Sequence, residues 1–483
     1  MKTLKTWRAA SWISVTSLRG APPPQTSPAP DLSTAPRAVW RLTWPQMLMM
    51  YLMFFMGFVA VWVAGQLSAQ VQAALGMVNQ CGILLMVVAM AVSSGATAAV
   101  SQSLGALRVS RARRYVVTTV AGSLGLGLII ALVGWLYGDP LLRLLQVPES
   151  IFPLTSDMWR VSMLGLPAQY VYASTGVMFR ATRQVLPPLW VAVGVCALNL
   201  LGCLGLGLGW FGLPKLGYMG LIWTGVAVQY LGALCNCLLL ARYGYLRRDA
   251  LPPFRWLKAA LPYLLKVALP AGAAQIVWQS GYMTLFVLVA SLPADSVNAL
   301  AGLTAGLRVE ALLFLPGMAC NMSVAVLVGN SLGAGRPEEA KRVGLFMVLV
   351  AAAAMSGMAA LLWPFRAEVA ALLSQEAGTR AQIVSYLTYN LLSTPFSIAS
   401  TVMGGIMVGA GATRYNLLIF GGTFWLVRLP LGWLLGHVLW GTASGVFAAM
   451  LCSQVLQTAI MFYVVRYRDW TRFAMRCRHQ RAV

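Results

Sequence analysis

One glutamate, Glu310, lies deep inside a long apolar run of this 483-residue chain. The chain has only twelve acidic residues, and the other eleven fall in tails, in loops or near the ends of apolar runs. A carboxylate at the centre of a bilayer costs about 2.5–3.5 kcal/mol on insertion scales, so Glu310 must face a cavity, a partner or a proton. Gly306, Gly317 and Asn321 lie on the same helical face as Glu310, at offsets of −4, +7 and +11 from it. This spacing predicts a stripe of small and polar residues.

Two interpretations of Glu310 stay open. It binds the ion or substrate of a transport process, or it pairs permanently with an arginine and only orders the packing of helices. Arg308 is two residues away and projects from roughly the opposite face, so it is not an obvious partner. Arg160 and Arg428 are possible partners from other parts of the bundle.

Other polar residues inside apolar runs are candidates for lining a substrate pathway. They are Gln275, Gln279, Asn199, Asn321, Tyr386, Asn390, Asn79 and Gln169. Gln275 with Gln279, and Tyr386 with Asn390, are spaced by four residues and therefore share a helical face. For each of these residues the alternative is an ordinary hydrogen bond between helices.

The elements that position these residues are membrane spans. A chain that is 59% hydrophobic and 10% charged is not a soluble protein with a polar surface. Apolar runs of about 20 residues, the length that crosses a bilayer as a helix, predict an all-α integral membrane protein with about twelve spans. The predicted spans are residues 44–65, 72–100, 116–138, 152–180, 187–210, 218–242, 264–292, 299–328, 343–363, 382–409, 416–437 and 440–465. Within them we expect Pro167, Pro316 and Pro395 to break or bend the helix and free carbonyl groups.

The net charge of +23 is explained by orientation in the membrane. Most of the 35 Lys and Arg residues fall in the two tails, in the central linker and in loops that follow even-numbered spans. By the positive-inside rule both termini are cytoplasmic, in a multi-pass protein of the cell (inner or plasma) membrane. We therefore expect the lipid bilayer as a partner and no nucleic acid.

A repeat divides the chain into two halves. The stretch SQSLGALRVSRARR at 101–114 returns as GNSLGAGRPEEAKR at 329–342, with seven of fourteen positions identical and an offset of 228 residues. Six spans per half, an even number, makes the two repeats parallel. The sequence predicts a disordered N-terminal arm at 1–40, six-helix lobes at 41–242 and 263–465, a cytoplasmic linker at 243–262 and a basic tail at 466–483.

Several strings together resemble the MATE (multidrug and toxic compound extrusion) family. They are SLGA with a basic segment after the second span, VGNSLGAGRPEEAKR after the eighth, the Pro-Gly of LRVEALLFLPGMA and the GAGATR that closes the tenth. The resemblance implies an exporter that exchanges protons or sodium ions for bulky, often cationic and aromatic compounds, with two lobes that open alternately. Positions where many family members have carboxylates fall here on Ala60, Cys203 and Ser397. The usual cation-binding acids of the family are therefore missing.

The sequence thus predicts a secondary active multidrug exporter, with Glu310 as its ion-coupling residue. Protons are favoured over sodium ions, because a hard cation needs several oxygen ligands and one glutamate supplies few. A flippase of a lipid-linked precursor is one alternative, and a binding or channel-like protein that has lost ion coupling is another. We expect a monomer that is not an enzyme and has no cofactor and no metal site, since the eight cysteines and two histidines show no metal-ligand spacing.

Overall fold

The computed structural model describes residues 36–145, 147–247, 250–293 and 295–475, which form helices and the turns between them. The predicted arm at 1–40 lies almost wholly outside the described residues, and so does the end of the predicted basic tail. The helices are α1 (Pro36–Leu67), α2 (Ala69–Gly105), α3 (Val109–Leu136), α4 (Gly138–Leu144), α5 (Phe152–Ala181), α6 (Leu186–Gly202), η1 (Cys203–Gly207), η2 (Trp210–Gly212), α7 (Tyr218–Arg242), α8 (Phe254–Ala290), α9 (Ser296–Gly333), α10 (Pro337–Leu362), α11 (Arg366–Leu373), α12 (Ala377–Ala410), α13 (Thr413–Gly422), η4 (Thr423–Arg428), α14 (Leu429–Trp433), η5 (Leu434–Leu439), α15 (Ala443–Tyr467) and η6 (Thr471–Phe473).

Twelve of these segments span the membrane. Among the described residues, eleven helical segments are long and apolar enough to cross a bilayer, with α6 continuing into η1 and α13 continuing through η4, α14 and η5. The twelfth span is α5, which is 30 residues long and carries Asp157 and Arg160 in its first half. Since α5 packs against α2, α3 and α7, other helices surround much of it and it need not be uniformly apolar. The predicted all-α membrane architecture is confirmed.

The two halves repeat each other element by element. Val109 begins α3 and Pro337 begins α10, while Gly138 begins α4 and Arg366 begins α11, so both pairs are 228 residues apart. The pairs α1 and α8, α2 and α9, α5 and α12, and α7 and α15 follow in the same order. The parallel duplication predicted from one short repeat therefore extends through the whole fold and includes the short helices α4 and α11, which lie outside the predicted spans.

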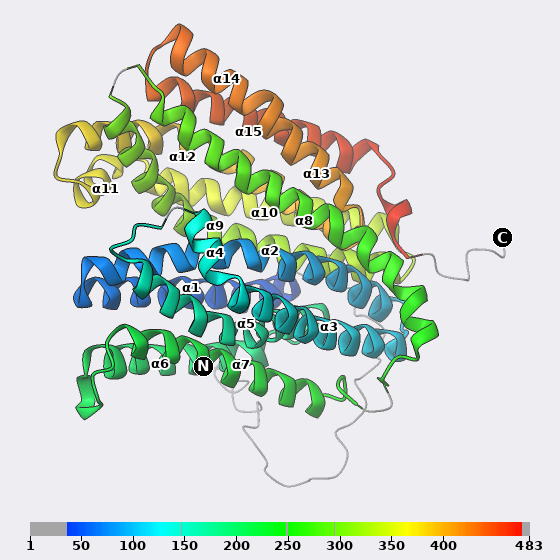
Figure 1. Ribbon diagram of the computed structural model, residues 1–483. Helices are drawn as coiled ribbons and strands as arrows, with labels where there is room; N and C mark the ends of the chain where they lie inside the picture. The colour runs from blue at the N-terminus through cyan, green and yellow to red at the C-terminus, as the bar shows by residue number, and fades with distance from the viewer. Residues whose placement is uncertain (1–35, 146, 248–249, 294, 476–483) are drawn as a thin grey trace, which may run out of the picture.

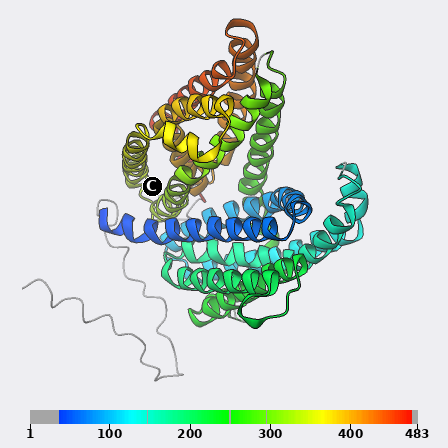
Figure 2. The ribbon, with the colours of Figure 1, turned by 90° about the vertical axis from the view of Figure 1, so that its left-hand side faces the viewer.

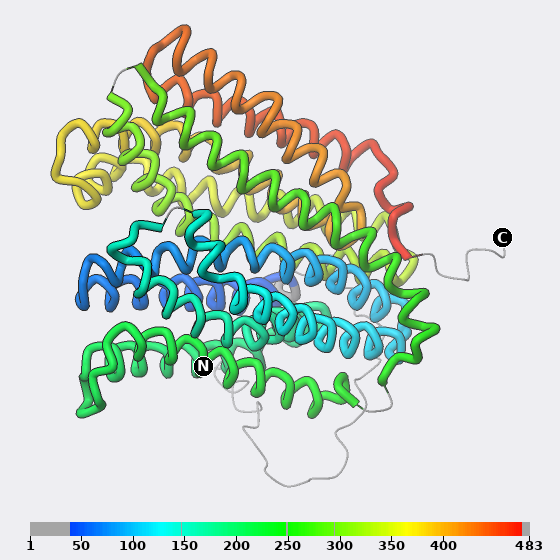
Figure 3. Tube along the Cα trace, in the orientation of Figure 1, coloured from blue at the N-terminus to red at the C-terminus, as the bar shows by residue number. Residues whose placement is uncertain are grey.

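The halves form two bundles that are inclined to each other (Figures 1 and 2). Helix α8 connects them: Figure 3 traces it from the lower right, beside the first bundle, to the upper left, within the second. It accordingly packs against α2 of the first bundle and against α13 of the second. Two clusters of buried apolar side chains lie each within one bundle, and a third joins Val39, Leu42 and Val185 of the first half to the second bundle.

The bundles meet where the repeated SLGA strings end α2 and α9. A Cβ atom on Gly105 would lie 2.0 Å from the backbone oxygen of Asn330, and one on Gly333 would lie 2.1 Å from that of Gln102. Gln102 and Asn330 are equivalent positions of the repeat, so the contact is reciprocal. Only glycine allows two helix backbones to approach so closely. The repeated glycines therefore hold the bundles together at the end that carries the basic loops.

Buried hydrogen bonds strengthen this junction. The Gln102 amide donates to the backbone oxygen of Gly409 at 2.8 Å and accepts from the hydroxyl of Tyr263 at 3.2 Å. Near the start of α1, the side chains of Thr43 and Gln46 lie 3.1 and 3.0 Å from the hydroxyl of Ser323 in α9. Both sets of bonds join one bundle to the other.

Three details differ from the sequence prediction. Helices α5, α9 and α12 continue through Pro167, Pro316 and Pro395, so these prolines do not break their spans, and a bend at them stays a prediction. A membrane helix tolerates a proline because its neighbours and small local adjustments satisfy the freed carbonyl groups. Helix α8 starts at Phe254, inside the range 243–262 predicted as linker. The irregular segments are instead the π-helical η1, η4 and η5.

Candidate functional site

Glu310 lies near the middle of α9 and faces α12. The hydroxyl of Tyr386 donates a hydrogen bond to its Oε2 atom, and the side chain of Asn390, one turn further along α12, is a second hydrogen-bonding neighbour. The spacing of four residues in α12 places both groups on the face that packs on α9. Glu310 as a whole residue is half-buried, and its carboxylate is held by α12.

Small residues allow this contact. A Cβ atom on Gly306, one turn before Glu310, would lie 2.2 Å from Cδ1 of Tyr386, so the tyrosine ring occupies the space left by the glycine. The ring is only 1% exposed and meets Phe447 of α15 edge to face, with ring centroids 5.1 Å apart. Tyr386 is thus fixed by packing on two sides, and its hydroxyl is directed by the protein core.

Arg428 of η4 supplies the positive charge next to Glu310. The arginine is 6% exposed; its Nε donates to Oγ of Ser453 at 2.8 Å, and its Nη2 donates to Oε1 of Gln454 at 2.6 Å. Among the described residues no ion pair within 4.0 Å joins Arg428 to Glu310. The two groups therefore attract each other through space, while the guanidinium keeps acceptors of its own.

Aromatic rings surround the guanidinium. It lies over the ring of Phe424 at 4.5 Å from the centroid, and the hydroxyl of Tyr282 in α8 is a hydrogen-bonding neighbour. Tyr282 also contacts Phe424 and Trp278, with centroid distances of 5.3 and 4.5 Å. Cation–π contacts of this kind stabilise a buried arginine.

A network of neutral polar groups extends from Arg428 towards α12. The Gln454 amide donates to the hydroxyls of Ser397 and Ser400, both at 3.2 Å. The Gln457 amide also donates to Ser400, at 3.0 Å, and accepts from Thr423 at 3.0 Å. Ser397, where the family resemblance leads us to expect a carboxylate, is therefore one member of an uncharged network that fixes the arginine.

This site is built only in the second bundle. The repeat positions equivalent to Glu310, Tyr386 and Arg428 are Gly82, Met158 and Leu200. None of these three residues has an ionisable side chain, so the duplicated fold contains one such site and not two. Among the residues that the structure describes, no group of three or more His, Cys, Asp or Glu side chains lies together as a metal site.

The other residues predicted from the sequence lie elsewhere or make ordinary contacts. Asn321 donates to the backbone oxygen of Thr401 at 2.6 Å and joins α9 to α12. Asn199 in α6 is buried and accepts a long contact of 3.8 Å from the thiol of Cys203. Gln275, Gln279 and Gln169 are half-buried, and Asn79 is exposed.

Two of the three arginines considered as partners of Glu310 do not contact it. Arg160 pairs with Asp139 at 2.6 Å in the first bundle, and Arg308 is exposed. Sequence reasoning missed Tyr282, Ser453, Gln454 and Gln457. The sequence does contain an indication of Ser453, Gln454 and Gln457. These three polar residues fall within five positions of an apolar run and therefore lie close together on one side of the helix.

A protein-family model described as MatE matches residues 45–204 and 270–434. The chain belongs to the MatE family. Among its MatE relatives, the multidrug resistance protein PmpM of Pseudomonas aeruginosa is 26% identical over 427 residues, which cover 84% of this chain and 88% of PmpM. The probable multidrug resistance protein NorM of Geobacillus kaustophilus is 25% identical and covers 90% of this chain and 96% of NorM.

Solved MATE structures share the fold. The MATE transporter VcmN of Vibrio cholerae superposes with a TM-score of 0.80 at 20% identity, covering 92% of this chain and 98% of VcmN. A MOP superfamily transporter from Pyrococcus furiosus gives a TM-score of 0.82 at 18% identity, covering 94% and 100% of the two chains. The family resemblance seen in the short motifs is thereby confirmed: the chain is a multi-pass membrane transporter of the MatE family.

Proposed function

We infer that this protein exports bulky, often cationic or aromatic compounds in exchange for protons, and that Glu310 carries the coupling proton. The observation that carries this proposal is the mid-membrane carboxylate of Glu310, held by Tyr386 and faced by Arg428 without a direct ion pair. Protonation removes a charge at the contact between α9 and α12, and so changes how the second bundle packs.

The acceptors of Arg428 support a reversible role for Glu310. Ser453 and Gln454 accept hydrogen bonds from the guanidinium, and neither bond involves Glu310. A purely structural salt bridge would instead leave the arginine without a partner whenever the acid became neutral, which is costly in a buried site. The arrangement therefore allows Glu310 to gain and lose a proton while the rest of the network is retained.

The ligands near Glu310 favour a proton over a sodium ion. A hard cation binds several oxygen atoms together, and the oxygens at hand are those of Glu310, Tyr386 and Asn390, next to the positive charge of Arg428. Oδ1 of Asn390 is buried and accepts no hydrogen bond from the described residues. A protonated Glu310 has an O–H group that can donate to such an acceptor.

The two bundles support alternating access. In our proposal they stay joined at Gly105 and Gly333 in one state and separate there in the other. By the positive-inside rule, we assign the end with the basic loops to the cytoplasmic side, which places both termini inside the cell. We propose that the protein acts as a monomer in the cell membrane. The lobes would then be residues 41–242 and 263–465.

Aromatic side chains beside the charged site suit aromatic cations. Trp278 is 39% exposed and contacts Tyr282, with the two rings tilted by 55°, at the edge of the Arg428 network. Gln275 and Gln279 precede and follow Trp278 in α8, and both are half-buried. Among the predicted pathway-lining residues, they are the nearest to Trp278 in sequence. Flat cations bind such aromatic faces through cation–π attraction.

The test is uphill efflux of ethidium from proteoliposomes, driven separately by a pH gradient and by a sodium gradient. We expect the pH gradient to drive efflux by the wild type and not by Glu310→Gln, while Glu368→Gln, an exposed acid in α11, behaves as the wild type. Efflux driven only by sodium would refute the proton as coupling ion. Normal proton-driven efflux by Glu310→Gln would refute the role of Glu310.

A flippase has less support. Such a protein needs several cationic groups that converge on a diphosphate. The three arginines inside spans do not converge, because Arg160 pairs with Asp139, Arg308 is exposed and Arg428 binds Ser453 and Gln454. A protein that has lost coupling altogether would show no uphill movement of any dye in the same assay.

A further inference from the structure

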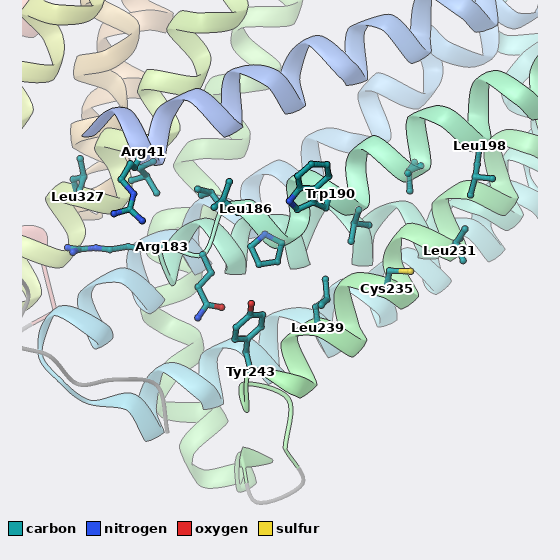
Figure 4. Close-up of a pocket in the computed structure, with 17 residues that line it drawn as sticks. Arg41, Arg183, Leu186, Trp190, Leu198, Leu231, Cys235, Leu239, Tyr243 and Leu327 are labelled. Carbon is teal, nitrogen blue, oxygen red and sulfur yellow. The ribbon is translucent and has the colours of Figure 1, made fainter. Parts of the chain in front are cut away.

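A groove of about 920 Å³ lies in the first bundle, between α1, α6 and α7 and away from Glu310. Its walls are apolar and use one face of α6 and one face of α7, each with a spacing of four residues. The lining residues on these faces are Leu186, Trp190, Gly194, Leu198, Leu231, Cys235, Leu239 and Tyr243. Several of them are largely exposed, Trp190 by 64%, so the groove faces the surroundings of the bundle and not its core (Figure 4).

The groove has the length of one lipid chain. Residues 186–198 of α6 extend over about 18 Å at 1.5 Å per residue, and one leaflet of the hydrocarbon core is about 15 Å thick. In the middle, a Cβ atom on Gly194 would meet no atom within 4 Å, so the floor of the groove is open there. An extended acyl chain fits these dimensions.

One end of the groove is positively charged. Figure 4 shows Arg41 and Arg183 at this end, whereas Leu198 and Leu231 lie at the other. Arg41 is exposed and makes no hydrogen bond or ion pair with the described residues. The acid next to Arg183 is Glu339, which already pairs with Arg336 at 3.3 Å. Burial lowers the pKa of Arg183, against the raising effect of Glu339, so its charge is only partly compensated.

The backbone at Arg183 is strained. Its φ angle is +62°, in the left-handed region, at the turn that follows α5. The equivalent position of the repeat is Gly411, with a φ angle of +76°. Glycine adopts this conformation freely, whereas a residue with a side chain does not. The first half therefore has an arginine at a turn where the second half has a glycine, although the backbone conformation favours glycine. This indicates that the side chain of Arg183 has a role.

We propose that this groove binds an anionic phospholipid from the leaflet on the side of the basic loops, with its phosphate on Arg41 and Arg183 and one acyl chain along α6 and α7. The charge complementarity at the end and the leaflet length of the apolar walls together select this occupant. Anionic lipids are abundant at the cytoplasmic surface, where basic residues attract them. Binding here would stabilise the contact of α6 and α7 with α1.

The test is native mass spectrometry of the full-length protein with equimolar dioleoyl phosphatidylglycerol and dioleoyl phosphatidylcholine. We expect the wild type to retain one phosphatidylglycerol in preference to phosphatidylcholine. Because each basic residue near a membrane surface contributes roughly a fivefold preference for anionic lipid, Arg41→Gln and Arg183→Gly should each reduce the preference by about that factor. Arg183→Gly keeps the fold, since glycine occupies the equivalent turn.

Two further variants complete the test. Gly194→Leu fills the open floor of the groove and should remove the retained lipid, while Arg342→Gln, an exposed arginine at the start of α10, should leave the preference unchanged. The proposal is overturned if Arg41→Gln and Arg183→Gly keep the preference of the wild type, or if Arg342→Gln reduces it equally. Equal retention of both lipids by the wild type also overturns it.

Discussion

At the scale of single residues, the hydrogen bond from Tyr386 to Glu310 depends on the hydroxyl group of the tyrosine. Tyr386→Phe keeps the ring and its edge contact with Phe447 but removes the hydroxyl. Since a hydrogen bond to a charged group contributes about 1.5–3 kcal/mol, we expect proton-driven ethidium efflux to fall by about tenfold or more with little loss of folded protein. Tyr389→Phe, on the same helix and half-buried, is the matched control. Equal loss in both variants would contradict a specific role.

The attraction through space between Arg428 and Glu310 makes a second residue-scale prediction. Arg428→Met removes the hydrogen bonds to Ser453 and Gln454 and leaves Glu310 without its neighbouring charge, so the free energy of unfolding should fall, by about 1–3 kcal/mol for each buried acceptor left without a donor. In the double variant with Glu310→Gln the acid is neutral as well, and part of this loss should be regained. Thermal unfolding in detergent of the wild type and the three variants measures the coupling. Strictly additive losses would show that the two groups do not interact.

How far the sequence predicts the site is clear from these residues. Glu310 is recognisable because a charged group in an apolar span is costly, and Tyr386 with Asn390 because their spacing places them on one face. That all three meet could not be predicted, since it depends on which faces of α9 and α12 pack together. Arg428 was one of two possible partners, and only the fold brings it next to Glu310 while Arg160 binds Asp139.

At the scale of elements, the crossing of α2 and α9 sets how closely the bundles join. Gly105→Ala introduces a methyl group 2.0 Å from the backbone oxygen of Asn330, so the helices must move apart. We expect faster amide hydrogen exchange at the C-terminal ends of α2 and α9 and reduced efflux. Gly122→Ala in α3, where a Cβ atom meets nothing within 4 Å, should change neither. Unchanged exchange in Gly105→Ala would show that the junction is not a close contact.

The turn after α5 gives the other element-scale prediction. A side chain in the left-handed region costs about 1–2 kcal/mol, and glycine loses about 0.5–1 kcal/mol through its greater freedom in the unfolded chain. Arg183→Gly should therefore stabilise the delipidated protein by about 0.5–1 kcal/mol, seen as a small rise in Tm. Leu107→Gly, at a φ angle of +56°, should behave alike, and Arg41→Gln should not. A fall in Tm for both glycine variants would show that these turns are not strained.

At the scale of the whole molecule, composition and periodicity predict much of the fold. Twelve spans and a parallel duplication follow from apolar runs and one repeated string, because a bilayer imposes helix length and a repeat imposes symmetry. Helices α4 and α11 were not predictable, since both are too short to cross a bilayer. The π-helical segments depend on local packing, which no periodicity reports. The lobe boundaries and the cytoplasmic position of the termini stay predictions.

The asymmetry between the halves is a property of the whole molecule. Only the second bundle has an acid, a tyrosine and an arginine at these equivalent positions, where the first has Gly82, Met158 and Leu200. Protonation of Glu310 weakens its attraction to Arg428, so acidification that protonates Glu310 should loosen the packing of α9 on α12. We expect hydrogen exchange to increase in these two helices and to stay constant in their counterparts α2 and α5.

Other titrating groups must be separated from this effect. The hydrogen bond from Ser156, at 2.5 Å, and then the guanidinium of Arg160 hold the pKa of Asp139 below its usual range, against the raising effect of burial. The contribution of Asp139 to stability is therefore present at pH 5 and above, and it is lost only as the pH falls through this lowered value. His437 lies 3.0 Å from the hydroxyl of Ser291, at the C-terminal end of α8, and remains in Glu310→Gln. If hydrogen exchange in α9 and α12 still increases in Glu310→Gln, another titrating group causes the response. If the increase disappears in this variant, the carboxylate of Glu310 makes the fold sensitive to protons.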